Sequence, residues 1–183
     1  MIPGYLITDP LYYSSDLDIF KSVLKKNLQS AEFALYRDKQ NQDYKLFAKE
    51  FVFTCKDAKV KPILHKDFSL ALKLGAYGVH LPFVQLQDVQ KAKDSGLFTV
   101  VSTHTLDEAK TAKRYGADAI TFSPIFYTPN KAEPVGLAPL KDIVDTISIK
   151  VIALGGILDD SQIEAVGKCG AFAYASIRKF IKG

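Results

Sequence analysis

The sequence predicts an α/β protein whose fold is a minimal (β/α)₈ TIM barrel, formed as a single domain by residues 1–183. Eight short apolar runs recur along the chain with little alternation, which is typical of parallel strands that are covered on both faces. Amphipathic segments separate these runs, and so regular an alternation favours a closed barrel over an open doubly wound sheet. The predicted strands are Tyr5–Thr8, Phe33–Tyr36, Pro62–Leu64, Gly78–Leu81, Phe98–Ser102, Ala119–Phe122, Lys150–Leu154 and Ala171–Ala175.

The segments between the runs carry helix signals. The segment Asp43–Lys56 places its apolar residues on one helical face. Thr105 followed by Glu108 predicts a capping box at the start of a later helix, and Gly116 predicts its end. A Gly-Ala pair stands just ahead of three predicted strands, where it marks a helix stop, a tight turn and the return to the sheet.

The chain is short for this fold, because its 183 residues compare with about 250 in a typical barrel. The connections must therefore be minimal, and the last helix, after Ser176, is predicted to be truncated to a stub over residues 177–183. A missing outer helix would leave apolar barrel surface uncovered near both chain ends. We therefore expect a homo-oligomer in which a partner subunit covers that surface.

Composition disfavours several classes of function. The net charge is only +4 and the lysines are scattered, so a nucleic-acid-binding surface is not expected. No segment approaches the roughly 18 apolar residues of a membrane span, and the first residues lack the pattern of a secretion signal, so we expect a cytoplasmic protein. Cys55 and Cys169 stand apart from any metal-ligand spacing, and we expect neither a metal ion nor a cofactor.

Polar residues that follow the carboxyl ends of the strands should share one rim of the barrel. His104 follows the fifth predicted strand and is suited to general acid–base chemistry, with solvation beside a helix cap as the structural alternative. Arg37 and Lys39 follow the second strand and are candidates for binding a phosphate or a carboxylate, unless they pair with Asp38. His80 lies inside a strand, where a hydrogen-bonded core histidine is expected.

Two late loops carry the signal of a phosphate site. Gly155 and Gly156 follow the seventh strand, where main-chain amides can approach an anion without obstruction from a side chain. Ser176 ends the eighth strand, and the loops after strands seven and eight form the usual phosphate site of this fold. An ordinary glycine turn, capped by Asp159 or Ser161, is the alternative.

A long polar loop, residues 123–131, joins the sixth strand to the next helix. Loops of this length in a minimal chain usually have a function. Thr128 can hydrogen-bond a substrate and Lys131 can neutralise its charge, although a lid without direct contacts is the alternative. Ser102, at the end of the fifth strand, is a further candidate on the same rim.

Taken together, the motifs YLITD, YRDK, GVHL, VSTHTLDEA, SPIFYTPNK, LGGI and ASI resemble, in order and spacing, the thiamine-phosphate synthase / TenI superfamily. The resemblance covers nearly the whole chain and implies a (β/α)₈ barrel, a thiazole-phosphate or thiamine-phosphate ligand and a role in thiamine biosynthesis. It also implies roles for the candidate residues. The amides around Gly155, Gly156, Ser176 and Ile177 would bind the ligand phosphate, Ser102, Thr128 and Lys131 would line the pocket, and Arg37 and Lys39 would bind a diphosphate.

The chain departs from the synthase pattern at places that the resemblance assigns to the pocket. Leu35 stands where a glutamine is expected, and Lys66 and Gln85 stand where the synthase has the carboxylates that hold magnesium. A lysine cation repels Mg²⁺, which needs hard oxygen ligands. We therefore expect the diphosphate-expelling reaction to be lost or badly weakened, with Asp67, one position away, as the residue that could rescue a magnesium site.

The TenI branch resembles the synthase in fold and thiazole pocket but needs no metal. Its reaction is a proton shift that makes a thiazole carboxylate phosphate aromatic, and His104 matches the histidine of this branch. The sequence therefore predicts a TenI-like tautomerase in which His104 moves the proton. Two alternatives stay open: a thiamine-phosphate synthase joining a pyrimidine diphosphate to thiazole phosphate, and a non-catalytic protein that binds thiazole phosphate or thiamine phosphate.

Overall fold

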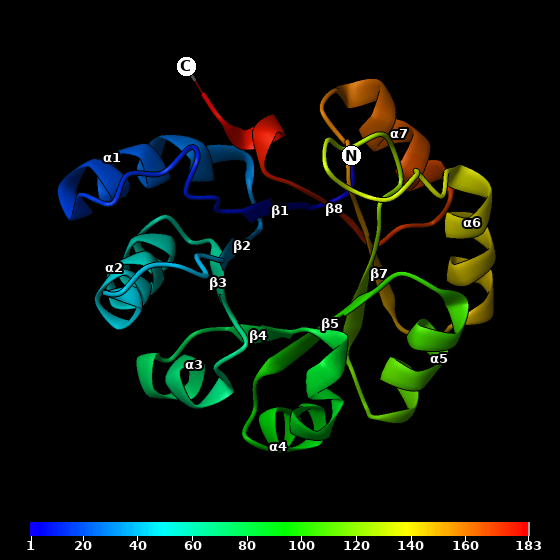
Figure 1. Ribbon diagram of the computed structural model, residues 1–183, viewed down its shortest axis with the longest axis horizontal. Coiled ribbons are helices and arrows are strands. Elements are labelled where there is room, and N and C mark those ends of the chain that lie inside the picture. Colours follow the sequence, from blue (N-terminus) through cyan, green and yellow to red (C-terminus); the bar gives the residue numbers. More distant parts are fainter. Residues whose placement is uncertain (183) are drawn as a thin grey trace.

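The computed structural model describes residues 1–182, and within them eight parallel strands close into a barrel in which each strand pairs with its neighbours in the sequence (Figure 1). The first strand also pairs with the last, with Leu6 beside Ser176. The prediction of a (β/α)₈ barrel is confirmed, and Gly183, at the end of the predicted domain, lies outside the described residues. The strands are β1 (Gly4–Ile7), β2 (Phe33–Tyr36), β3 (Lys61–His65), β4 (Gly78–Leu81), β5 (Phe98–Thr103), β6 (Ala119–Phe122), β7 (Lys150–Leu154) and β8 (Ala173–Ser176).

Helices surround the barrel and follow the strands in turn (Figure 1). None of the helices described between residues 1 and 182 combines the length and the apolar character needed to cross a bilayer. The α-helices are α1 (Leu17–Asn27), α2 (Tyr44–Asp57), α3 (Phe68–Leu74), α4 (Val89–Asp94), α5 (Leu106–Arg114), α6 (Leu137–Thr146) and α7 (Asp160–Lys168), and the 3₁₀ turns are η1 (Leu28–Ser30), η2 (Phe83–Asp88) and η3 (Arg178–Phe180).

Four of the predicted strands have the observed bounds, and the ends of the other four differ by one or two residues, because hydrogen bonding rather than hydropathy sets them. Ala171 was predicted to open the last strand, but its amide donates to Val166 O and thereby closes α7, so β8 begins at Ala173. The start of α5 is capped as expected, because Thr105 Oγ1 accepts from the amide of Glu108. The Glu108 carboxylate accepts from the amide of His104, one residue ahead of the cap.

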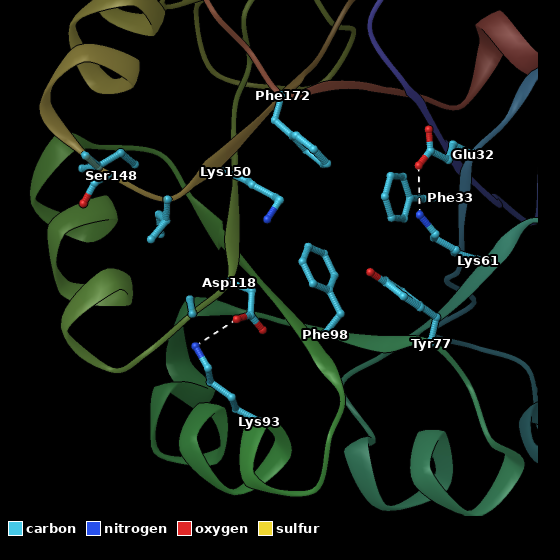
Figure 2. Close-up of a pocket in the computed structure, with 13 residues that line it drawn as sticks. Glu32, Phe33, Lys61, Tyr77, Lys93, Phe98, Asp118, Ser148, Lys150 and Phe172 are labelled. Carbon is cyan, nitrogen blue, oxygen red and sulfur yellow. Dashed lines mark hydrogen bonds and ion pairs between the residues drawn. The ribbon is translucent and has the colours of Figure 1, made fainter.

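The amino-terminal end of the barrel is closed by a layer of aromatic rings. Figure 2 shows Phe33, Phe98, Phe172 and Tyr77 around one space, into which the ammonium of Lys150 points. Phe33 and Phe98 stack with their ring centroids 6.2 Å apart, and Lys150 Nζ lies 5.4 Å from the centroid of Phe172. A cavity of about 790 Å³ lies here, but this face of a TIM barrel normally serves stability, so we interpret the layer as a plug.

The last turn corrects the expectation of uncovered surface near the chain ends. The last helix is truncated as predicted, because after Ser176 the chain forms only the 3₁₀ turn η3, which lies between α1 and α7 (Figure 1). Phe180 is 1% exposed and stacks on Tyr174 with ring centroids 5.7 Å apart. The amide of Lys182 donates to Asn27 Oδ1 and so fastens the end of the chain to α1. The chain itself covers this surface, and a homo-oligomer stays a prediction that needs another basis.

Candidate active site

The carboxyl ends of the strands form a rim that is rich in positive charge. Arg37 follows β2, Lys66 follows β3, and Lys131 lies in the loop after β6. The charge of Arg37, then partial burial, then the charges of Lys66 and Lys131 lower the pKa of Lys39. The structure thus brings Arg37, Lys39 and Lys131 together, as predicted from their places after the strands, and adds Lys66. Cations held this close repel one another, and a bound anion offsets that repulsion.

His65 is the last residue of β3, and its side chain is half-buried. Burial, followed by the charges of Arg37, Lys66 and Lys39, lowers the pKa of His65 to about 4. Lys66 has a left-handed backbone with φ of 68°, and its amide donates to His80 O at 3.0 Å. A non-glycine residue in this conformation costs roughly 1–2 kcal/mol, so Lys66 is held at the rim against a local backbone preference.

Three side chains form a hydrogen-bonded row through the barrel interior. Tyr5 Oη lies 3.0 Å from His80 Nδ1, and His80 Nε2 lies 3.0 Å from Ser102 Oγ. His80 is 3% exposed, and burial lowers its pKa to about 3, with smaller effects of His65 and Arg37. The prediction of a hydrogen-bonded core histidine is therefore confirmed, and Ser102 is connected to the barrel interior.

His104 is exposed between β5 and α5. Its Nδ1 lies 2.9 Å from the carbonyl oxygen of Ser123 and 3.3 Å from Ser123 Oγ. Because a carbonyl oxygen can only accept, Nδ1 carries a proton, and in the neutral ring Nε2 keeps its lone pair. His104 also borders a groove of about 340 Å³ between α5 and α6, with Phe122 and Val135 among its lining residues. Among residues 1–182 no hydrogen-bond partner reaches Nε2, so the ring is oriented with one nitrogen available, as a general base requires.

The loop after β7 packs tightly on the loop after β6. Gly155 and Gly156 have φ of 104° and 67°, and a Cβ on Gly156 would lie 2.5 Å from Tyr127 O. The amide of Phe126 donates to Gly155 O, which joins the two loops. Within residues 1–182 the amides of Gly156 and Ile177 have no hydrogen-bond acceptor. Free amides in left-handed or turn conformations are suited to binding an anion.

Two predicted hydroxyl ligands are engaged within the protein. Ser176 Oγ donates to Ile157 O at 2.8 Å and accepts from the amide of Lys179 at 3.2 Å, so it ties together the loops after β7 and β8. Thr128 Oγ1 donates to Phe126 O at 3.1 Å. Their contact with a ligand stays a prediction, and for Ser176 it would come from the main chain. The alternative glycine turn is also present, because Asp159 caps α7 with a capping box.

Two histidines with lowered pKa values, the buried His80 and the half-buried His65, predict a stability that falls in weak acid. Both His80 and His65 have a pKa below the unfolded value, so the unfolded chain binds more protons between about pH 4 and 6.5. The free energy of unfolding should therefore rise with pH across this window and fall as the pH drops, by about 1.4 kcal/mol per pH unit for each fully buried histidine. Urea unfolding at pH 5 and pH 7 measures this difference, and equal midpoints would contradict a lowered pKa of the two histidines.

Fold and rim together define a (β/α)₈ barrel whose catalytic face suits a small anionic ligand. A family model described as thiamine monophosphate synthase matches residues 4–180. The chain belongs to this family of thiamine-biosynthesis enzymes, and the resemblance inferred from the motifs is confirmed.

The relatives carry the same name. The chain is 36% identical over 182 residues to "Putative thiamine-phosphate synthase 2" of Aquifex aeolicus, covering 97% of each chain. It is 34% identical over 158 residues to the thiamine-phosphate synthase of Chlorobium phaeobacteroides, covering 81% of this chain and 77% of that one. The solved thiamine phosphate pyrophosphorylase from Pyrococcus furiosus has a TM-score of 0.79 at 25% identity, covering 96% of this chain and 85% of that one. These names match the synthase alternative rather than the tautomerase prediction.

The residues at the places that the family resemblance assigns to magnesium do not fit that ion. Lys66 carries a positive charge, and Asp67 accepts from the amide of Leu70 at 2.8 Å as the cap of α3. Gln85 reaches Asp88 instead, with its Nε2 3.4 Å from Asp88 Oδ2. In the described part of the chain no three His, Cys, Asp or Glu side chains gather where they could hold a metal ion. Mg²⁺ is usually held by carboxylates together with substrate phosphates, and here a lysine replaces one carboxylate.

Several residues of this site were missed from the sequence as contributors. Tyr5 was read only as part of an apolar strand, although a tyrosine at an inward position needs a partner for its hydroxyl. Lys66 was noted as a departure from the family and not as a member of the cationic rim. Ser123 orients His104 through its main chain, for which a sequence has no signal.

Proposed function

We propose that this protein acts on a thiazole phosphate of thiamine biosynthesis in a reaction that does not use magnesium. The reaction that fits best is the tautomerisation that makes a thiazole carboxylate phosphate aromatic. The observation that carries this proposal is the composition of the rim, where Arg37, Lys39, Lys66 and Lys131 supply positive charge. A ligand with a phosphate and a carboxylate complements such a rim without a metal ion between them.

The two ends of the ligand would be held by different parts of the rim. The free amides of Gly156 and Ile177, after β7 and β8, support a phosphate site there. The ligand carboxylate would then face Arg37 and Lys39 after β2. Binding at both ends would orient the thiazole ring across the mouth of the barrel, where orientation of the reacting atoms contributes to rate.

His104 would carry the proton. Its Nε2 takes a proton from the ring carbon of the non-aromatic tautomer, and the imidazolium then returns a proton to the exocyclic carbon. Atoms and electrons balance, because the substrate and product are isomers and no oxidant is needed. The fixed Nδ1–H to Ser123 O favours the free Nε2 as the reacting nitrogen.

The synthase reaction is the second candidate, and the names of the relatives favour it. Arg37 and Lys39 are also suited to a diphosphate. A non-catalytic binder of thiazole phosphate is the third reading, since every rim contact described here serves binding as well as catalysis.

A coupling assay separates the first two candidates. Purified protein is given the pyrimidine diphosphate and thiazole phosphate, with magnesium or with a chelator, and thiamine phosphate is quantified. We expect no enzyme-dependent product in either condition, because Lys66 stands where the metal ligand is needed. Robust magnesium-dependent product would establish the synthase instead. A Lys66→Asp variant is the matched probe, since a carboxylate at this position should restore a magnesium response only if the rim is a damaged synthase site.

A further inference from the structure

We propose that Tyr5 and His80 are positioning residues that fix the direction of the Ser102 hydroxyl, so that Ser102 donates a hydrogen bond to the ligand. The site would then select ligands that present an acceptor, such as a ring nitrogen or a carboxylate oxygen, beside β5. This inference rests on the proposed function only in placing the ligand at the mouth of the barrel.

The donor and acceptor roles along this row of hydrogen bonds are set first at Tyr5. Its side chain is 0% exposed, and burial holds the pKa of the phenol well above its ordinary value, so the hydroxyl keeps its proton. In the part of the chain that the structure describes, the one hydrogen-bond partner of Tyr5 Oη is His80 Nδ1. A buried donor left without an acceptor is strongly disfavoured, so Tyr5 donates and Nδ1 accepts.

His80 donates the next hydrogen bond of the row. Burial lowers its pKa to about 3, so the ring is neutral at physiological pH and carries one proton. Because Nδ1 accepts from Tyr5, that proton lies on Nε2. His80 Nε2 therefore donates to Ser102 Oγ across 3.0 Å.

Ser102 is the last residue of the row. A serine hydroxyl has one proton and two lone pairs, and here His80 occupies one lone pair. Between residues 1 and 182 the Ser102 side chain has no other hydrogen-bond partner. Its proton is therefore free to point into the mouth. A site built to donate one hydrogen bond discriminates against analogues that lack the acceptor, because the donor is then left unpaired.

Histidine ¹⁵N NMR of the unliganded protein tests the direction without reference to function. We expect His80 Nδ1 to show the shift of an unprotonated nitrogen and Nε2 that of a protonated one. In Tyr5→Phe the preference of the His80 proton for Nε2 over Nδ1 should weaken or reverse, since Nδ1 loses its donor. Tyr13→Phe is the matched control, because the Tyr13 hydroxyl is buried but contacts Asn27. A proton on Nδ1 of His80 in the wild type would overturn the inference.

A double-mutant cycle tests the consequence for binding, with thiazole phosphate and inorganic phosphate as probes. We expect Tyr5→Phe and Ser102→Ala each to raise the Kd of thiazole phosphate about ten-fold, the equivalent of one hydrogen bond of roughly 1.4 kcal/mol. In the Ser102→Ala background Tyr5→Phe should have no further effect, and inorganic phosphate should bind equally to all variants. Additive losses would mean that Tyr5 acts through packing and would overturn the inference. If wild type binds no thiazole phosphate, the proposed function fails, while the ¹⁵N shifts still decide the direction of the row.

Discussion

Replacement of His104 by alanine is expected to reduce the turnover of thiazole carboxylate phosphate by about 10²–10⁴-fold, the usual contribution of a general acid or base. The ring is exposed and its removal leaves no cavity in the core, so folding should be unaffected. Ligand affinity should change little, because the predicted phosphate and carboxylate contacts lie on other loops. Single-turnover kinetics and a separate titration of the ligand measure the two quantities.

His104→Gln is the control for this result. Glutamine can keep a hydrogen bond to Ser123 O but cannot take up a proton, so it should be as inactive as alanine. Added imidazole should restore part of the activity of His104→Ala and should leave the rate of the wild type unchanged. Full turnover in His104→Ala would remove this residue from the mechanism, and unchanged binding without wild-type turnover would favour the non-catalytic reading.

Replacement of Gly156 by alanine is expected to destabilise the fold and to abolish phosphate binding. The new Cβ would lie 2.5 Å from Tyr127 O and 2.8 Å from Phe126 C. Both are main-chain atoms, which cannot rotate away as the end of a flexible side chain can. The left-handed backbone, with φ of 67°, adds its own strain. Overpacking costs about 1–3 kcal/mol and the left-handed conformation roughly 1–2 kcal/mol, so a loss of about 2–5 kcal/mol is expected in urea unfolding.

Gly136→Ala is the matched control for the glycine prediction. Gly136 also has a positive φ, 80°, but no atom lies within 4 Å of the position of its Cβ. It should therefore show only the backbone cost, of roughly 1–2 kcal/mol, with unchanged affinity for inorganic phosphate. If both variants lose the same stability and both still bind phosphate, close packing of the two loops at Gly156 is not what shapes the site.

The barrel could be predicted from the sequence because buried parallel strands leave a direct signal. Runs such as Ala119–Phe122 and Lys150–Leu154 are mainly apolar, and the structure has strands with the same bounds. The truncation of the last helix followed from the chain length, but the packing of that end was not predictable in this way. Three residues of η3 are too few for a helical period, and the burial of Phe180 against Tyr174 and beside Gly4 is a tertiary contact.

The candidate site could be predicted in part, for a related reason. Strand order alone places Arg37 and Lys131 on one rim, because parallel strands all end at the same face. The row through Tyr5 and His80 joins residues 75 positions apart on strands that are not neighbours in the sheet. Their contact depends on which side of each strand faces the barrel interior, and short apolar runs with no polar alternation do not reveal that.

The most direct test of the central claim is the rate at which purified wild-type protein aromatises thiazole carboxylate phosphate in the presence of a metal chelator, followed by NMR. We predict an acceleration over the spontaneous reaction that is unchanged by added magnesium and absent in His104→Ala. No acceleration with the chelator, or one that appears only when magnesium is restored, would contradict a metal-independent proton transfer at this rim.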